Sequence, residues 1–156
     1  MTNCDVTQIM LRALIGAREA IKDGCEMAFA EIERNGNFNP TTAKSVVAQI
    51  CEQGTKRIAQ NLTKDMGDTD PKHHKKYHRG IKNGTIGEQE AMQYSIGASI
   101  TKLLEMTGYM VAGRTIERFD KELKLNVGKA KHIVNNVAEM VCNELSFKYH
   151  QDHKTA

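Results

Sequence analysis

The stretch from Val6 to Arg34 reads VTQIMLRALIGAREAIKDGCEMAFAEIER and decides the expected fold. Its apolar and small residues recur at spacings of three and four, which is the period of an amphipathic α-helix. The stripe consists of Met10, Ala13, Ala17, Ala20, Gly24 and Met27. Because small side chains let another backbone approach closely, we expect this helix to be a central or dimer-forming element.

A second helix is predicted to begin at Asn39 and Pro40. Asn is a favoured N-cap residue, and proline is favoured at the first helical position. The preceding residues 35–38 have the composition of a turn. The apolar stripe of this helix consists of Ala43, Val47, Ile50, Gly54 and Ile58. We expect the helix to end near Lys64.

The third and fourth helices are predicted on either side of a break near Gly108. Thr85 and Glu88 have the spacing of a capping box, so a helix is expected to begin there. Its predicted inner face consists of Met92, Ile96, Ser99, Leu103 and Met106. Gly108 and Gly113 interrupt this pattern, and we expect a separate helix from Ala112 to Leu123. The residues predicted to be buried in it are Ile116, Phe119 and Leu123.

A fifth helix is predicted from Asn126, as its cap, to about Tyr149. Its inward residues are Val134, Val137, Val141 and Leu145. Residues 151–156 are polar, and we expect them to form a frayed tail. The sequence therefore predicts an all-α, single-domain bundle of about five helices that covers residues 1–150, with its topology open.

Composition and charge agree with this interpretation. A chain of 156 residues suits one domain, and its aromatic content of 5% without Trp suits closely packed helices better than a β-sandwich. The net charge of +3 is too small to mark the whole surface as a nucleic-acid or membrane binder, so local charge must decide. We find no apolar window of about 18 residues and no signal-like start, and we expect a cytoplasmic protein without a membrane partner.

The four cysteines are expected to be free thiols. They are widely separated and never form a CxxC pair, and without an export signal a reducing compartment is expected. These residues are Cys4, Cys25, Cys51 and Cys142. Cys25 and Cys51 belong to apolar helical stripes, where a cysteine acts as a small hydrophobic residue.

The most distinctive segment lies between the second and third predicted helices. Residues 65–87 are rich in glycine and are predicted to be a long basic loop. Within it, the cations can contact phosphates, Tyr77 can stack on a base, and Arg79 can bind phosphate or guanine through its forked guanidinium. The candidate nucleic-acid-binding residues are Lys72, His73, His74, Lys75, Lys76, Tyr77, His78, Arg79 and Lys82.

Other interpretations of this segment remain open. It could be a solvated loop that Asp65, Asp68 and Asp70 partly neutralise, or it could bind an acidic protein surface. His74 and His78 have the i, i+4 spacing of paired metal ligands, but the neighbouring lysines would repel a cation. We predict no metal site and no cofactor.

The chain carries none of the common catalytic motifs. It has no nucleotide-binding glycine loop, no nucleophile elbow, no HExxH motif and no EF-hand loop. Arg114, Glu117 and Arg118 are expected to form helical ion pairs, and Glu88 and Glu90 to stabilise a helix N-terminus. No catalytic residue is predicted.

These observations favour a non-enzymatic binding protein whose helical scaffold presents the basic segment to an anionic macromolecule, most of all nucleic acid. The alternative is a dimeric helical adaptor or inhibitor that binds a protein partner through its helix faces. It rests on the apolar residues of Val6–Ile15 and Leu103–Val111, which lie on nearly opposite sides of their helices. Such helices bury both sides only if they are central to the bundle or if one of them packs in a homodimer. An enzyme with dispersed catalytic residues is the third hypothesis.

Overall fold

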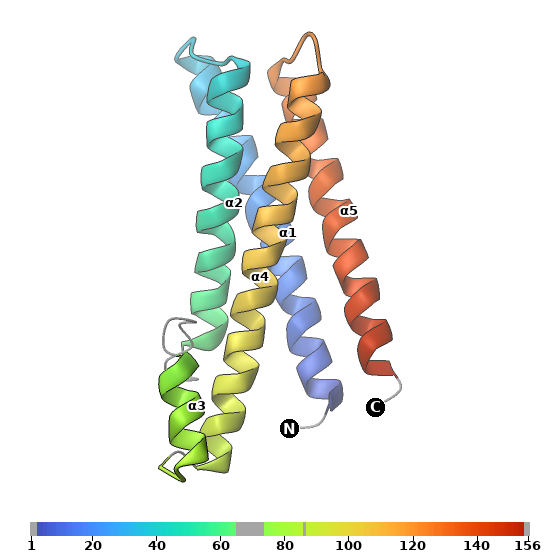
Figure 1. Ribbon diagram of the computed structural model, residues 1–156. Helices are drawn as coiled ribbons and strands as arrows, with labels where there is room; N and C mark the ends of the chain where they lie inside the picture. Colours follow the sequence, from blue (N-terminus) through green and yellow to red (C-terminus); the bar gives the residue numbers. More distant parts are fainter. Residues whose placement is uncertain (1–2, 65–73, 86, 155–156) are drawn as a thin grey trace.

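The computed structural model describes residues 3–64, 74–85 and 87–154. They form five helices, which are α1 (Asn3–Arg34), α2 (Pro40–Thr63), α3 (His74–Lys82), α4 (Glu88–Lys121) and α5 (Val127–Lys154) (Figure 1). No strand occurs in these three ranges. The predicted all-α bundle is therefore confirmed, although two of its five helices differ from those expected.

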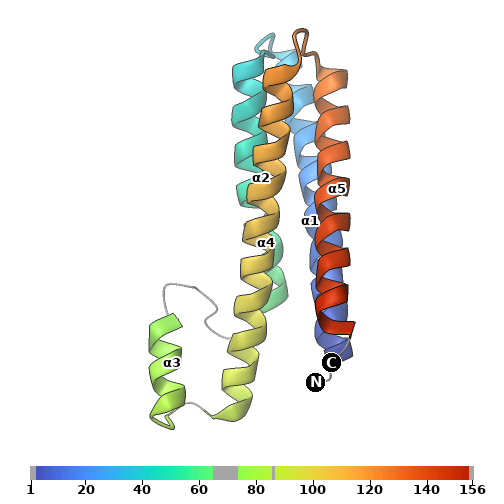
Figure 2. The ribbon, with the colours of Figure 1, turned by 45° about the vertical axis from the view of Figure 1, so that its right-hand side comes forward.

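The four long helices form an up-down-up-down bundle. α1 packs against α2, α2 against α4, and α4 against α5, which returns to pack against α1 (Figure 1). α3 lies outside this bundle, beside the first turns of α4 (Figure 2). The bundle is thus a scaffold from which the short helix stands apart.

The N-terminus of α2 is fixed by a capping box. The side chain of Asn39 accepts a hydrogen bond of 3.0 Å from the backbone N–H of Thr42, and Oγ1 of Thr42 accepts one of 3.0 Å from the backbone N–H of Asn39. Pro40 follows at the first helical position, where its missing N–H costs nothing. The predicted start of this helix is confirmed, and such a cap stabilises it by about 1 kcal/mol.

Glycine and asparagine also define the end of α1 and the start of α5. After α1, Gly36 adopts a positive φ of 70°, and the N–H of Asn37 reaches the carbonyl of Ile32 at 2.9 Å, as in a Schellman motif. Before α5, Oδ1 of Asn126 accepts a hydrogen bond from the N–H of Lys129 at 2.9 Å, which confirms its predicted role as a cap.

The core has two parts along the bundle axis. The larger part joins all four long helices around Phe29, whose ring centroid lies 6.4 Å from that of Phe119 and 6.0 Å from that of Phe38. The smaller part joins α1, α2 and α4 and is built from Met10, Ala13, Ala17, Ala59, Ile100 and Leu104. α5 contributes no buried residue to this second cluster, so α4 and α5 share a less extensive contact there.

The small-residue stripe of α1 packs inside the chain. Ala13 and Ala17 are fully buried in the second cluster. A Cβ at Gly24 would lie 2.8 Å from Cγ2 of Ile50, so α1 and α2 approach closely there. Met27 does not share the buried face, because 74% of its surface is exposed. Of the two roles expected for α1, central or dimer-forming, this packing within the chain agrees with the first.

Ala17→Leu is expected to lower the free energy of unfolding by about 1–3 kcal/mol, because the added atoms overpack a filled site. The elution volume on a sizing column should not change, since the contact lies within one chain. Ala48→Leu adds the same atoms at an exposed position of α2 and serves as the control in urea denaturation. An Ala17→Leu variant as stable as its parent would place the stripe at the surface.

α4 differs most from prediction. It runs unbroken from Glu88 to Lys121 and includes both Gly108 and Gly113, which were expected to separate two helices. Its N-cap is Gly87 without a side-chain hydrogen bond, so the predicted capping box of Thr85 and Glu88 is wrong. Burial against α2 compensates the helix for the cost of its glycines, about 1 kcal/mol each relative to Ala.

The buried face of α4 was also mispredicted. The helix buries Tyr94, Gly97, Ile100, Leu104, Thr107, Gly108, Val111, Thr115 and Phe119. Of the predicted inner face, Met92, Ser99 and Met106 are exposed, while Ile96 and Leu103 are partly buried. α4 is apolar on two sides. α2 packs on the side that carries small residues such as Gly108, whereas the prediction had chosen the side with the larger apolar residues.

The connection after α4 and the end of α5 both differ from prediction. Leu123 is 99% exposed instead of buried, because α4 has already ended at Lys121 and this residue lies in the connection to α5. α5 continues to Lys154, so residues 151–154 are helical and not a separate tail.

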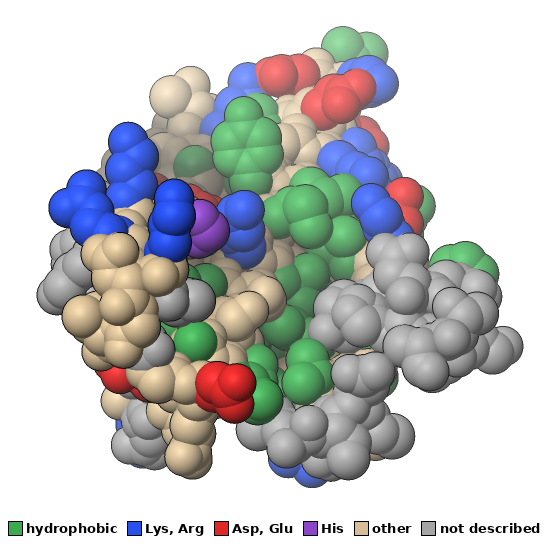
Figure 3. Space-filling model, turned by 60° about the horizontal axis from the view of Figure 1, so that its bottom comes forward, with side chains coloured by type: hydrophobic (Ala, Val, Ile, Leu, Met, Phe, Trp, Pro, Cys, Tyr) green, Lys and Arg blue, Asp and Glu red, His purple; other side chains and the backbone are tan. Residues whose placement is uncertain are grey.

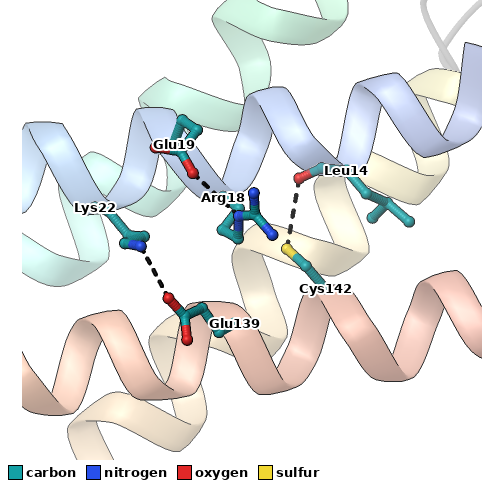
Figure 4. A network of polar contacts seen from close by, with 6 residues as sticks. All are labelled: Leu14, Arg18, Glu19, Lys22, Glu139 and Cys142. Atoms are coloured by element: carbon teal, nitrogen blue, oxygen red, sulfur yellow. Dashed lines mark hydrogen bonds and ion pairs between the residues drawn. The ribbon is translucent and has the colours of Figure 1, made fainter.

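A polar network joins α1 to α5 (Figure 4). Nζ of Lys22 donates to Oε1 of Glu139 at 2.9 Å, and this hydrogen bond together with the charge of Lys22 holds the pKa of that carboxyl below its usual range. One turn away, Sγ of Cys142 lies 3.5 Å from the carbonyl oxygen of Leu14, to which the thiol donates (Figure 4).

Three of the cysteines are buried free thiols, as predicted. Burial raises the pKa of Cys51 to about 12 and that of Cys142 to about 11, and it raises the pKa of Cys25 further, with a contribution from the nearby Cys51. Thiolate, the reactive form, is therefore strongly disfavoured at all three. The side chain of Cys4 lies outside the described part of the chain.

In a Cys4→Ser variant, the three buried thiols are expected to react with a disulfide reagent only after the protein is unfolded. Dithiothreitol should leave the melting temperature unchanged, because none of the three contributes to a disulfide. A thiol of the folded variant that reacted at the rate of free cysteine would contradict the burial described above.

Candidate nucleic-acid interface

The basic segment contains a helix where a loop was predicted throughout. Residues 74–82 form α3, and a Schellman motif ends it. The N–H of Thr85 reaches the carbonyl of Gly80 at 2.9 Å, and Gly84 takes a positive φ of 73° that glycine adopts without strain. The hydroxyl of Thr85 donates to the same carbonyl at 3.2 Å. Thr85 therefore ends α3 and does not cap α4.

The described cationic side chains of α3 share one face. Lys75, His78, Arg79 and Lys82 follow one another at spacings of three, one and three residues, and all four are exposed. This spacing keeps them within one side of an α-helix over about 10 Å of its length. Gly80, on the other side of α3, is buried, and α3 packs against α4.

Five of the predicted site residues cannot be placed in the same detail. Lys72 and His73 lie outside the described residues. His74, Lys76 and Tyr77 belong to α3, but their side chains lie outside the described part. The candidate interface consists of the four described side chains, which we call the α3 basic face.

Ion pairing distinguishes the α3 basic face from the bundle. Carboxylates pair with lysines between helices, as in Lys131 with Glu26, Lys129 with Glu122 and Lys44 with Asp120. Within the ranges that the structure describes, no carboxylate pairs with Lys75, Arg79 or Lys82. Figure 3 shows lysine and arginine side chains gathered around a histidine on one side of the molecule. These three side chains are exposed on α3.

A second charged region lies between α4 and α5. Nη1 of Arg114 donates to Glu144 at 2.7 Å, Nη1 of Arg118 to Oδ1 of Asn136 at 3.0 Å, and Nζ of Lys121 to Glu117 at 3.2 Å. The predicted pairing of Arg114 and Arg118 with Glu117 is therefore wrong. These cations line a surface depression together with Val137 and Met140, but protein groups already satisfy them.

No group of three potential metal ligands occurs among the side chains described. The candidate pair His74 and His78 lies on one helix, but only the second imidazole can be placed. The arrangement thus offers positive charge at a helix surface and supplies no described nucleophile or metal cage around it.

Sequence analysis missed two residues on the neighbouring surface of α4. Lys102 and Tyr109 are both exposed and lie seven residues apart, so they share one face of that helix. Their i, i+7 spacing was visible in the sequence. The signal was missed because α4 was assigned the wrong buried face and was divided at Gly108.

None of the described helices is both long enough and apolar enough to cross a membrane. Comparison with family models, with curated proteins and with solved structures gave no match to this chain.

Proposed function

We propose that this protein is a non-enzymatic binding protein that uses the α3 basic face to bind the phosphate backbone of nucleic acid. The observation that carries the proposal is the exposure of Lys75, Arg79 and Lys82 on one side of a helix without a described carboxylate partner. Each phosphate that such a cation neutralises releases condensed counterions, which is the main source of non-specific affinity for nucleic acid.

The chemistry of the individual side chains supports phosphate as the ligand group. The planar guanidinium of Arg79 can donate two parallel hydrogen bonds to one phosphate, whereas Lys75 and Lys82 act as compact point charges. A helical face of about 10 Å matches a short run of successive phosphates, since each strand of a duplex carries one phosphate per 3.4 Å of helix axis.

The scaffold supports the same function. A Schellman motif ends α3, and α3 packs against α4, so the helix sets the order of the cations before a ligand arrives. Such preorganisation lowers the entropic cost of binding. We infer that the protein binds nucleic acid in the cytoplasm.

A pull-down with and without nuclease tests this function. The tagged protein should recover nucleic acid from its native host, and nuclease treatment should release whatever else is captured with it. A mobility shift with arbitrary DNA or RNA that weakens as salt rises would support phosphate binding. Capture of one protein that resists both nuclease and salt would contradict the proposal.

A second candidate function is that of a dimeric adaptor or inhibitor that binds a protein partner through its helix faces. The observation that favours it is the second apolar side of α4, where Met92 and Met106 are exposed. Methionine is common at surfaces that bind several partners, because its side chain is flexible. Salt-resistant binding to a protein would select this candidate over nucleic acid.

A further inference from the structure

Tyr109 is the most exposed aromatic residue among those described. Its side chain lies near the middle of α4 and is 84% exposed, whereas Tyr94 on the same helix is buried. A solvent-exposed tyrosine ring on a rigid helix can stack on a nucleic-acid base. Its position relative to the cations therefore decides whether it could serve that purpose.

The contact between α2 and α4 fixes where Tyr109 points. A Cβ at Gly108 would lie 2.7 Å from the carbonyl oxygen of Cys51 and 2.8 Å from Oγ1 of Thr55, so the two helices nearly touch there. Tyr109 directly follows Gly108, and Lys56 directly follows Thr55. Since one residue turns an α-helix by about 100°, both side chains emerge beside this contact, and both are exposed.

Lys102 extends the same surface toward α3. It lies seven residues before Tyr109 on one face of α4, which corresponds to about 10 Å along the helix. Glu52 and Glu105 are also exposed near the contact of the two helices and offset the charges of Lys56 and Lys102. This surface therefore adds little net charge, and its distinctive group is the aromatic ring.

We infer that Tyr109 is a base-stacking platform and that the preferred ligand is single-stranded nucleic acid, whose bases are free to stack. This inference rests on the proposed function, because the α3 basic face supplies the phosphate contacts. α3 lies beside the first turns of α4 (Figure 2), and α4 rises about 30 Å from Glu88 to Tyr109. Even at the 3.4 Å rise of a strand within a duplex, about nine nucleotides cover this distance, so a 12-nucleotide single strand is long enough to span both parts.

The test measures the fluorescence anisotropy of labelled 12-nucleotide single strands, of RNA and of DNA, with the matching duplexes. Tyr109→Ala is expected to weaken single-strand binding by about 5- to 150-fold, while duplex binding and the salt dependence stay unchanged. Tyr109→Phe should retain the parent affinity, since it keeps the ring. Phe147→Ala removes another exposed aromatic ring, on α5, and should have no effect.

Two further measurements separate stacking from a general effect on the fold. A dinucleotide is too short to contact α3 and Tyr109 together, so Tyr109→Ala should not change its affinity for the α3 basic face. Glu105→Gln should tighten binding of the 12-nucleotide strand, because it removes a negative charge beside the platform.

The failures of the two proposals are distinguishable. If the parent binds the single strand and Tyr109→Ala binds it equally well, the platform is wrong and the α3 basic face stands. If the parent binds no strand at low salt, both proposals are wrong. Equal losses for Tyr109→Phe and Tyr109→Ala would also overturn the stacking role.

Discussion

Gly108→Ala is expected to lower the free energy of unfolding by roughly 2–3 kcal/mol. The new Cβ would lie 2.7 Å from the backbone oxygen of Cys51, which cannot rotate away as a side chain could. α2 and α4 would have to separate along their extensive contact, and this overpacking exceeds the gain of about 1 kcal/mol that alanine brings to a helix. Urea denaturation followed by circular dichroism measures the change.

Gly113→Ala is the matched control on the same helix. No atom lies within 4 Å of the position that its Cβ would take, and the residue is exposed. Alanine should therefore stabilise the protein by about 0.5–1 kcal/mol through its helix propensity. If both variants were stabilised alike, the close approach of α2 and α4 would be wrong.

Replacing Lys75, Arg79 and Lys82 together by Ala is expected to weaken nucleic-acid binding by roughly 100-fold at low salt, since each cation loses a charge-assisted contact with phosphate. The loss should be similar for every sequence tested, because phosphate contacts do not depend on the base. The melting temperature should change little, because all three side chains are exposed.

A charge-matched variant distinguishes the contribution of the α3 basic face to binding from that of the overall net charge. Arg34, Lys124 and Lys148 are also exposed, and the first two lie at the end of the bundle far from α3 (Figure 1). Replacing these three by Ala changes the net charge by the same amount. Nucleic-acid affinity that fell equally in both triple variants would show that total charge governs binding.

The parts of the fold that could be predicted are those fixed by local chemistry. Asn39, Pro40 and Asn126 have side chains or ring geometry that satisfy helix ends without help from other helices, and each acts as expected. The small-residue stripe of α1 was also predictable, because its period of 3.6 residues is unbroken across Ala13 and Ala17.

The parts that could not be predicted depend on tertiary packing. Gly108 suggests a break when only its helix propensity is considered, yet it permits a close approach of α2 and α4. Met92 and Met106 look like core residues, and small residues of the same helix face the neighbour instead. Which of two apolar sides is buried depends on the partner helix.

The candidate site was predicted in composition but not in form. The residue types in 72–82 indicated a basic cluster, whereas the helical arrangement that gathers Lys75, His78, Arg79 and Lys82 depends on the turn at Gly84 and on the contact of α3 with α4. The rich supply of glycine suggested a loop, yet Gly84 ends a helix and Gly80 is buried within it.

The salt dependence of binding tests the central claim most directly. Anisotropy titrations of the parent protein from 50 to 200 mM salt should give a slope of log K against log salt between about −2 and −3, as three phosphate contacts require at about 0.7 each on single strands and 0.9 on duplex. The Lys75, Arg79 and Lys82 triple variant should lose most of that slope. A parent protein whose binding does not depend on salt, or that binds no nucleic acid at 50 mM, would contradict the α3 basic face as a phosphate-binding site.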